Sequence, residues 1–537
     1  MAMQRRSLLG GLALPLIPGA ALAHAGHRAP VVETTSGRLR GIAGEGVAVF
    51  KGIPYADTTA GAHRFLPPQA APRWAGVREA TEYGRNAPQL RGPGVPEFAW
   101  YWADLPQGED ALSLSLFTPA TDDRRRPVLL WLHGGAFSSG TGSAPGFDGS
   151  HLARAQDVVV VSINHRLNLF GHFFTGEPQD GLSPEAGNLG VLDQIAALRW
   201  VRDNIERFGG DPGNVTIFGQ SGGAAKVTAL LATPAAKGLF HRAIVQSASG
   251  AWRLATPENA ARAAHAVLTE LGLTAHEASR LRDVPVDRLL AALGKVGPAE
   301  FRPVLDGRVF TQHPYEPAAA DTARDVPVLI GWTETEATFF LAGDPGNFTL
   351  DAARARARIQ RFLRLDEAAT DRVIAGYRDL YPEATPSQLL IRVASDQNYR
   401  LPTALVADRH AAGGAPTYAY EFNWVSPARQ GALGSPHTGE VPFVFGTLDA
   451  AQALVAGSPE APRIRDRLGA IWAGFARTGR PQSEAVADWR PYSAADRNTA
   501  LLGGEWRVAK DTLARPRELI GALKPFEYSD PVTFIRD

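Results

Sequence analysis

Residues 214–225, NVTIFGQSGGAA, constrain the fold of this chain more than any other stretch. Residues 215–218 are apolar and mostly β-branched, which is typical of a buried strand, and residues 224–231 have the character of a helix. Between them stands Gly219-Gln220-Ser221-Gly222-Gly223, so a strand leads through a tight turn with a serine at its tip into a helix. This is the nucleophile-elbow pattern, G-x-S-x-G. Its outer glycines are needed because side chains there would collide with the neighbouring strand or helix.

Strand-like runs alternate with helical segments along the rest of the chain. Further strands are predicted at residues 128–132, 158–163, 242–246, 326–332 and 417–424, and helices at 187–208 and 259–271. This alternation predicts an α/β fold with a largely parallel sheet covered on both faces. Active sites in such sheets gather at the carboxyl ends of the strands, and each catalytic candidate below follows a strand.

The first 25 residues differ in character from the rest. A short basic region ends in Arg5-Arg6, an apolar and small-residue run covers 8–23, and Ala21-Leu22-Ala23 fits a cleavage site. The pattern resembles a twin-arginine export signal, with an ordinary Sec signal as the alternative. Either signal predicts an exported, periplasmic or secreted protein in which residues 26–537 form a single catalytic domain. Two prolines within the apolar run argue against stable membrane insertion.

The overall composition excludes several classes of function. Lys plus Arg and Asp plus Glu both count 55, so the formal net charge is zero and nothing favours a nucleic-acid partner. The chain has no cysteine, which rules out thiol nucleophiles, iron–sulfur clusters and cysteine zinc sites. We expect neither a metal nor a cofactor.

An elbow serine needs a general base and an acid that orients it, in the chain order Ser, Asp or Glu, His. The predicted strand at 326–332 is followed by Glu334 and Glu336, which leaves two candidate acids. Only His410 and His437 come later in the chain. His410 stands at the end of what reads as an exposed helix, which is typical of a surface histidine. His437 lies in the turn-rich loop GSPHTGE, where catalytic side chains are common, so we expect it to be the base.

A second turn follows the predicted strand at 128–132. His133-Gly134-Gly135-Ala136 is expected to supply backbone N–H donors from Gly135 and Ala136, and Gly222 a third. Such an oxyanion hole stabilises the intermediate of acyl transfer, and each donor is worth about 3 kcal/mol. A plain tight turn is the other interpretation of the H-G-G sequence, and the nearby elbow argues against it.

With these residues in place, an ordered series of motifs resembles the type-B carboxylesterase family of cholinesterases and bacterial para-nitrobenzyl esterases. The matching stretches are FKGIPYA at 50–56, WLHGGAF at 131–137, NHRL at 164–167, the long run at 187–223, GLFHRAIVQSAS at 238–249, FRPVLDG at 301–307, HTGEVPFVFG at 437–446 and WAGFARTGRP at 472–481. The resemblance covers nearly all of residues 26–537. It implies the α/β-hydrolase fold, insertions that form a deep gorge, and hydrolysis of a small-molecule carboxylic ester.

The resemblance also selects the acid. The family pattern Asp-Glu-Gly carries the catalytic glutamate, and the matching residues here are Thr335-Glu336-Ala337, so Glu336 takes the role and Glu334 becomes a solvated neighbour. Ser247 and Glu440 match polar positions that support the histidine in the family.

Several residues are expected to line the gorge. They are Trp100 and Trp102 of an aromatic cluster at 98–102, Trp332, Phe339 and Phe340 after the acid's strand, and Gln220 beside the nucleophile. Core packing is the other interpretation of these aromatic residues. Cholinesterases carry a glutamate at the position of Gln220, and without it the gorge has less reason to hold a quaternary cation. We therefore expect neutral, hydrophobic or aromatic esters as substrates.

One departure from the family concerns a disulfide. The family usually closes a loop between two cysteines, and the matching residues here are Ala87 and Ala111. Losing such a closure forgoes roughly 3 kcal/mol in the chain-entropy account. The loop between them is predicted to be more mobile than in disulfide-closed relatives.

Two rival functions use the same scaffold. An amidase or carbamate hydrolase would use the same three catalytic residues. A non-catalytic binding protein, like the cholinesterase-like adhesion domains, would typically lack the serine or the histidine, and both are present here.

Overall fold

The computed structural model describes residues 29–92 and 94–523, so the expected export signal at residues 1–25 lies outside the described residues. The strands are β1 (Val31–Thr34), β2 (Gly37–Arg40), β3 (Ile42–Gly44), β4 (Val47–Pro54), β5 (Val77–Glu79), β6 (Ser113–Thr118), β7 (Arg126–Leu132), β8 (Val159–Ile163), β9 (Gly210–Gln220), β10 (Arg242–Gln246), β11 (Val328–Thr333), β12 (Thr417–Phe422), β13 (Asn498–Leu502) and β14 (Arg507–Lys510).

The helices fall between these strands, as the alternating pattern predicts. They are α1 (Ser150–Gln156), α2 (Asn168–Gly171), α3 (Leu189–Asn204), α4 (Gly222–Leu231), α5 (Pro257–Leu271), α6 (Val286–Val296), α7 (Thr338–Leu341), α8 (Ala352–Leu363), α9 (Glu367–Leu380), α10 (Pro386–Ser395), α11 (Leu401–Ala412), α12 (Val441–Phe445), α13 (Gln452–Val455), α14 (Ala461–Thr478) and α15 (Ala514–Ile520).

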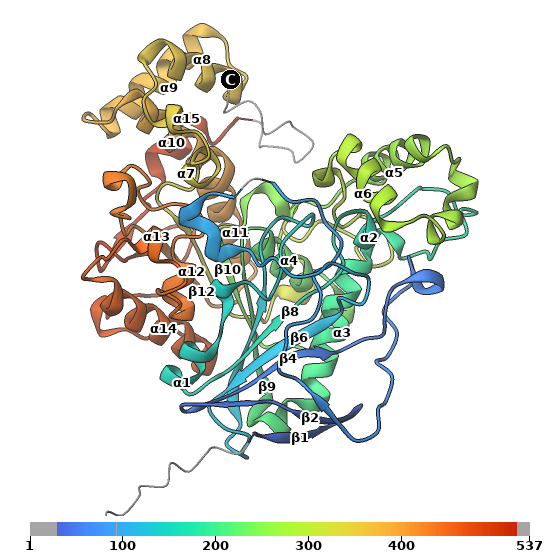
Figure 1. Cartoon of the computed structure of the whole chain (residues 1–537). Coiled ribbons are helices and arrows are strands. Elements are labelled where there is room, and N and C mark those ends of the chain that lie inside the picture. The colour runs from blue at the N-terminus through green and yellow to red at the C-terminus, as the bar shows by residue number, and fades with distance from the viewer. Residues whose placement is uncertain (1–28, 93, 524–537) are drawn as a thin grey trace, which may run out of the picture.

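An 11-stranded sheet crosses the molecule in the order β14-β13-β12-β11-β10-β9-β7-β8-β6-β4-β3. All neighbours from β8 to β13 are parallel, and the strands at both edges are antiparallel. The α/β fold with a large, mostly parallel sheet is therefore confirmed. A separate three-stranded sheet, β1-β2-β5, lies at one end (Figure 1).

Both faces of the sheet are covered because successive strand side chains point to opposite sides. In β7, Val128, Leu130 and Leu132 pack in one buried cluster with α3 and α4. Leu129 and Trp131 pack in a second cluster with α1, α12 and α14. Burying both faces explains why the central strands are continuous apolar runs without polar alternation.

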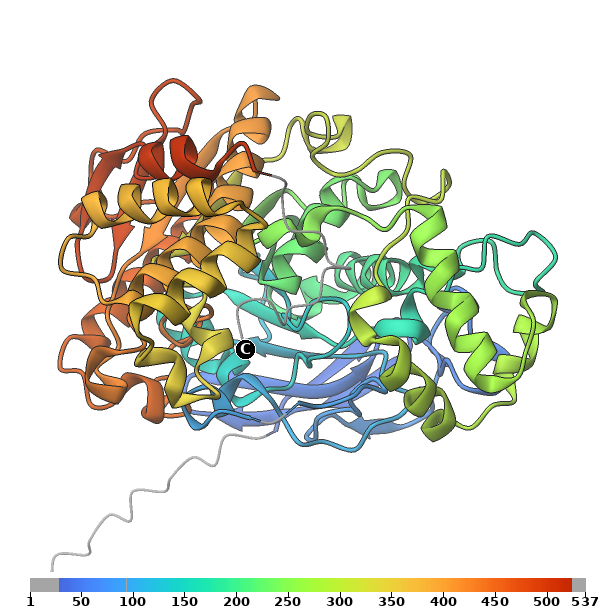
Figure 2. The same cartoon turned by 90° about the horizontal axis from the view of Figure 1, so that it is seen from above.

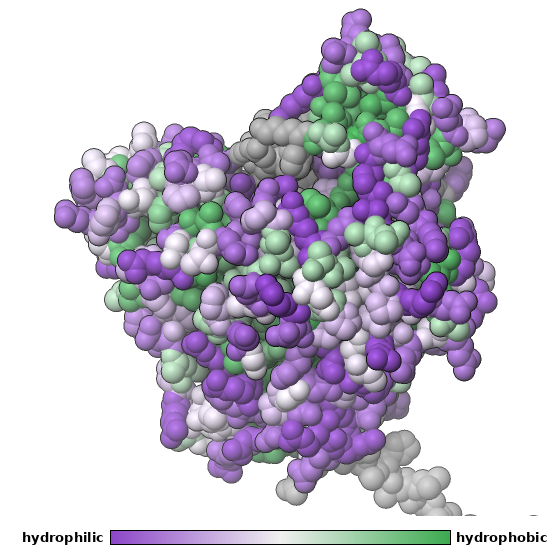
Figure 3. Space-filling view, turned by 180° about the vertical axis from the view of Figure 1, so that it is seen from behind, coloured by the Kyte–Doolittle hydropathy of each residue, from purple (hydrophilic) through white to green (hydrophobic). Residues whose placement is uncertain are grey.

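Two groups of helices rise beyond the sheet, as Figures 1 and 2 show. Helices α5 and α6 form one lobe with its own apolar core, and α8, α9 and α10 form the other with a separate core. The face seen in Figure 3 is largely hydrophilic, and its largest cluster of apolar residues lies on the second lobe. Among residues 29–92 and 94–523, no helix is both long enough and apolar enough to cross a membrane.

The main difference from the sequence prediction is the length of β9, which begins at Gly210 rather than Val215. The segment Gly209-Gly210-Asp211-Pro212 is turn-like in composition, but Gly210 pairs with Arg126 of β7 across a register shift. Pairing with a neighbouring strand thus decides a boundary that local composition does not.

Candidate active site

The elbow serine lies between β9 and α4 with φ 60° and ψ −123°, a conformation that non-glycine residues rarely adopt. Its backbone N–H donates to the Gln246 carbonyl of the neighbouring strand at 2.8 Å, which fixes the turn. A Cβ on Gly219 would lie 2.7 Å from the Leu132 carbonyl oxygen, and one on Gly223 only 2.0 Å. The close approach of β7 therefore requires both outer glycines of the pattern.

His437 and Glu336 are joined by a hydrogen bond between imidazole Nδ1 and carboxylate Oε2. The other carboxylate oxygen accepts bonds from the Ser247 hydroxyl at 2.6 Å and the Thr333 backbone N–H at 2.8 Å. All of these side chains are fully buried. Fixed on both oxygens, Glu336 holds the ring in one orientation through Nδ1, so Nε2 is the nitrogen that the carboxylate leaves to other partners.

The two loops that carry these residues are tied to each other. Thr335, next to Glu336, donates its backbone N–H to the Ser435 carbonyl at 3.0 Å. Glu334 turns away and pairs with Arg392 at 2.7 Å, in a half-buried position rather than the solvated one expected. Of the two candidate acids, only Glu336 reaches the imidazole.

Gln220 connects the elbow to the imidazole. Its amide nitrogen lies 3.0 Å from His437 Nε2, and its amide oxygen accepts a bond from the Tyr101 hydroxyl at 2.9 Å. Since Gln220 directly precedes Ser221, this contact brings the imidazole and the elbow together. Ser221, Ser247 and Glu336 follow the adjacent parallel strands β9, β10 and β11, and His437 follows β12.

The three expected oxyanion donors also lie together. A Cβ on Gly222 would lie 2.3 Å from both the nitrogen and the Cα of Ala136, so the two backbones touch and only glycine fits. Among the described residues, the N–H groups of Gly135 and Ala136 donate to no protein acceptor. Gly222 is the first residue of α4, whose N–H has no acceptor within the helix. Three free donors beside a strained serine can bind a developing negative charge.

The sequence profile of the Carboxylesterase family matches residues 28–516. This chain belongs to the type-B carboxylesterase family.

Individual carboxylesterases support the assignment over almost the whole chain. The para-nitrobenzyl esterase of Bacillus subtilis (strain 168) is 36% identical over 502 residues, covering 91% of this chain and 98% of the relative. The Geobacillus stearothermophilus carboxylesterase EST55 structure at pH 6.2 has a TM-score of 0.79 at 39% identity, covering 91% and 99% of the two chains. A Clostridium hathewayi esterase, described as able to hydrolyse aliphatic aromatic polyesters, has a TM-score of 0.79 at 33% identity, covering 92% and 98%. The protein is thus a carboxylic-ester hydrolase.

Aromatic rings surround the imidazole of this carboxylesterase. The ring centroids of Phe339 and Phe340 lie 5.7 Å and 5.2 Å from that of His437. Tyr399 lies closer still, at 4.5 Å, and stacks on Phe340. It belongs to a π-helical turn, η12 (Asp396–Arg400), and the sequence prediction missed it because no local pattern marks such a turn.

The aromatic cluster at 98–102 is only partly at the site. Tyr101, which the prediction did not single out, is the member that bonds to Gln220. Trp100 is buried in the core, where its ring lies 2.3 Å from where a Cβ on Gly146 would stand. Trp102 is half-buried and contacts the Tyr101 ring edge-on at 5.5 Å. Trp100 is therefore placed in the core rather than in the gorge.

Trp332 requires the same correction. It is fully buried, packs against Ala404 and Leu513, and donates its indole N–H to Glu421 at 3.0 Å. Glu421 is its direct cross-strand partner in β12. Packing against Ala404 places the indole on the α11 side of the sheet.

Glu440 contacts Gln246 rather than the histidine itself. Its side chain is fully buried and accepts a bond from the Gln246 amide at 3.0 Å. Burial raises the pKa of Glu440 to about 7, the Gln246 bond opposes this, and the charge of Glu336 adds to it. Glu440 thus bonds to Gln246, whose carbonyl accepts the Ser221 N–H, while Ser247 donates its hydroxyl directly to Glu336.

His410 is not the surface residue that its sequence context suggests. It is buried, with Nδ1 2.9 Å from the Tyr315 hydroxyl and Nε2 2.9 Å from the Val326 carbonyl oxygen. Burial lowers the pKa of His410 to about 4. The residue is a structural histidine that joins α11 to the segment before β11.

The positions of the missing disulfide are buried together. Ala87 and Ala111 form a small apolar cluster with Leu167. Within the loop between them, the two carboxylate oxygens of Glu97 bind Arg429 at 2.7 Å and 2.8 Å, and Tyr101 bonds to Gln220. Its predicted mobility stays a prediction.

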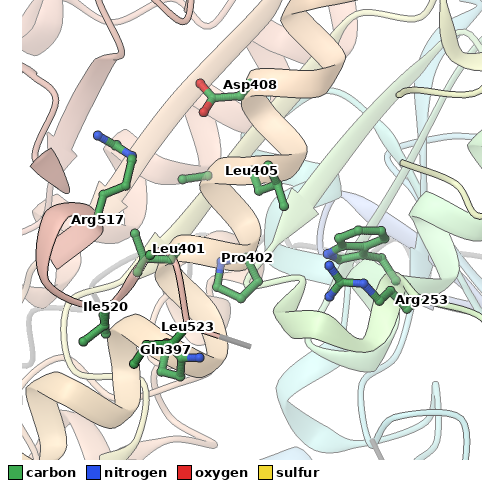
Figure 4. Close-up of a pocket in the computed structure, with 12 residues that line it drawn as sticks. Arg253, Gln397, Leu401, Pro402, Leu405, Asp408, Arg517, Ile520 and Leu523 are labelled. Atoms are coloured by element: carbon green, nitrogen blue, oxygen red, sulfur yellow. The ribbon is translucent and has the colours of Figure 1, made fainter. Parts of the chain in front are cut away.

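A cavity of about 260 Å³ lies between α11 and α15, as Figure 4 shows. Gln397 of η12 lines it together with Leu401 and Trp252. Ser221, Glu336 and His437 do not line this cavity. The turn η12 therefore contributes one side chain to the cavity and another, Tyr399, to the surroundings of the imidazole.

Proposed function

We propose that this carboxylesterase hydrolyses neutral esters with hydrophobic or aromatic groups, using Ser221 as nucleophile, His437 as general base and Glu336 as orienting acid. The observation that carries the proposal is the buried hydrogen bond between His437 Nδ1 and Glu336, together with the 3.0 Å distance from His437 Nε2 to the amide nitrogen of Gln220, the neighbour of Ser221. This arrangement has the roles and order of a Ser-His-acid triad.

In the proposed reaction, His437 Nε2 takes the Ser221 proton as the hydroxyl oxygen attacks the ester carbonyl. The negative charge that forms on the carbonyl oxygen is stabilised by the N–H groups of Gly135, Ala136 and Gly222. The intermediate collapses to an acyl-enzyme, and His437 gives the proton to the leaving alcohol. Water then attacks the acyl-enzyme by the same route, and the acid product and free Ser221 are released.

Two features support neutral substrates. Gln220 places an uncharged amide where a carboxylate would attract a cation, and the rings of Phe339, Phe340 and Tyr399 provide apolar surface beside the imidazole. The relatives point the same way, because one is named for para-nitrobenzyl esters and another is described as acting on aliphatic aromatic polyesters. A quaternary ammonium ester gains no partner charge from residue 220.

The test is hydrolysis of para-nitrophenyl esters over a range of acyl lengths by wild type and Ser221→Ala, with a para-nitroanilide and a choline ester in parallel. We expect turnover of short and medium esters, none by the variant, and little on the choline ester. Ester hydrolysis that survives in Ser221→Ala would overturn the proposed nucleophile. Faster turnover of the anilide than of the matching ester would favour an amidase.

We further propose that residues 1–25 direct export by the twin-arginine route, since Arg5-Arg6 precedes a mild apolar run. Fusing these residues to a folded reporter and fractionating cells gives the test. A double Arg5→Lys, Arg6→Lys change should retain the reporter in the cytoplasm. Export that persists in this variant would instead indicate the Sec route.

A further inference from the structure

A fully buried lysine lies beneath the nucleophile. Lys226 is in α4, five residues after Ser221, and its exposed fraction is 0%. Lysine is almost never fully buried without an ionic partner, yet no carboxylate of the described residues forms an ion pair with its Nζ. Burial holds the pKa of Lys226 well below its usual range. Pairing of charges therefore does not explain why a lysine occupies this position.

The contacts of Lys226 are with the segment that carries the oxyanion donors, residues 133–137. Its Nζ donates a hydrogen bond to the His133 carbonyl at 2.7 Å, immediately before Gly134-Gly135-Ala136. In the part of the chain that the structure describes, no other donor reaches that carbonyl. The same Nζ lies 5.9 Å from the ring centroid of Phe137, the last residue of the segment. One side chain thus bonds to the first residue of the segment and lies near the ring of its last residue.

This segment needs external support because its backbone is irregular. Gly135 has φ 85° and Ala136 has φ 54°, and an alanine in the left-handed region is strained. On one side the Tyr101 hydroxyl lies only 1.7 Å from where a Cβ on Gly134 would stand. On the other side the first turn of α4 touches Ala136. Strained backbone of this kind persists only where its surroundings fix it.

The environment offers no substitute for the lysine. The His133 and His165 rings stack at 4.9 Å with an interplanar angle of 13°, and the His133 Nδ1 lies 2.8 Å from the Gly134 carbonyl oxygen. Burial is the main cause, and the charge of Lys226 the second, that holds the pKa of His133 well below its usual range, so this ring is neutral. A buried carbonyl that loses its only donor carries the full desolvation cost, and the segment would relax to recover a partner.

We propose that Lys226 is a positioning residue, which holds the oxyanion segment at residues 133–137 in the geometry that binds the transition state. The inference rests on the proposed function, since the N–H groups of Gly135 and Ala136 act only if Ser221 forms an oxyanion there. The effect should therefore appear in the chemical step and in binding of a tetrahedral adduct, and not in ground-state binding of the ester.

The test compares two variants of similar side-chain size. Lys226→Met removes the hydrogen-bond donor, whereas Lys226→Gln keeps an uncharged donor on a side chain one bond shorter than lysine. For Lys226→Met we expect kcat on a para-nitrophenyl ester to fall about 10- to 100-fold, below the effect of deleting a whole oxyanion donor, with KM nearly unchanged. The inhibition constant of an octyl trifluoromethyl ketone, which forms a tetrahedral adduct, should rise by the same factor. In Lys226→Gln, kcat should fall and the ketone inhibition constant should rise by a smaller factor, which is again the same for both.

Thr228→Val is the matched control. Thr228 is also fully buried in α4, and among residues 29–92 and 94–523 its hydroxyl bonds only to the Ala225 carbonyl of the same helix, at 2.8 Å. We expect this variant to lower the midpoint of urea unfolding while leaving kcat and the ketone inhibition constant at wild-type values.

The outcomes separate the inference from the proposed function. Loss of kcat without weaker ketone binding, or wild-type kinetics in a folded Lys226→Met, would overturn the positioning role. If Lys226→Met does not fold, the same two measurements on Lys226→Gln decide. A wild-type protein that hydrolyses no ester would instead refute the proposed function, before any lysine variant is compared.

Discussion

Glu440 offers a quantitative test of how burial controls ionisation near the site. Its carboxyl is fully buried, with one oxygen bonded to Gln246 and the other without a hydrogen-bond partner among the described residues. Burial raises its pKa from an ordinary 4.5 to about 7. At about 1.4 kcal/mol per pKa unit, the gap between these values corresponds to about 3 kcal/mol of folding free energy that depends on pH.

The sign follows from where the proton is bound. Below pH 4.5 the carboxyl is protonated in both the folded and the unfolded chain, so the contribution of Glu440 to stability is complete. As pH rises toward 7, the unfolded chain releases this proton while the folded protein keeps it, so stability is lost. Above pH 7 both states are ionised and the loss stays constant.

The assay is urea unfolding of wild type and Glu440→Gln at about pH 5 and pH 8. Glutamine cannot titrate, so the free energy of unfolding of wild type relative to the variant should fall by about 2 to 3 kcal/mol between these pH values. Glu505→Gln, at an exposed carboxylate bonded to Arg507, controls for the loss of one negative charge. A difference between wild type and Glu440→Gln that is the same at both pH values would refute the reasoning.

Three further predictions concern the site and its loop. Gln220→Glu places a carboxylate beside His437, and that negative charge favours the imidazolium. The acid limb of the pH profile of kcat/KM should therefore move to higher pH by about one unit or more. An acid limb that does not move would contradict the contact between residue 220 and His437. A double Ala87→Cys, Ala111→Cys variant should form a disulfide, because the two side chains share one buried cluster. The bond should add about 3 kcal/mol of stability against urea, lost on adding a reductant, and free thiols after oxidation would disprove it. In the wild type, amide hydrogen exchange of residues 94–107 should be faster than that of β9, whereas equal protection would show that the Glu97–Arg429 pair replaces the missing disulfide.

The sequence by itself determined the parts of this carboxylesterase that depend on local pattern. Apolar runs predicted the strands, and a serine between glycines predicted the elbow, because only glycine tolerates the approach of Leu132 to Gly219 and Gly223. The order of serine, acid and histidine along the chain restricted the base to His410 or His437. These features lie within a few residues of one another or follow from chain order, and they are readable without tertiary contacts.

Tertiary structure decided what each side chain touches. Family resemblance selected Glu336, and the fold shows the contact that distinguishes it from Glu334, which pairs with Arg392 instead. Tyr101 and Tyr399 reach the site from segments far away in sequence. A strand position alone does not say which neighbour an indole meets, and for Trp332 that neighbour is Glu421 of β12.

Lys226 illustrates the same limit most clearly. In sequence it is the one charged residue in an otherwise apolar and small-residue helix, and nothing in the local pattern marks it as buried. The fold places it at zero exposure beneath the segment at residues 133–137, because α4 is covered on both sides by the sheet and neighbouring helices. Burial and partners are properties of contacts between distant segments, so they are set by the packed structure and not by local composition.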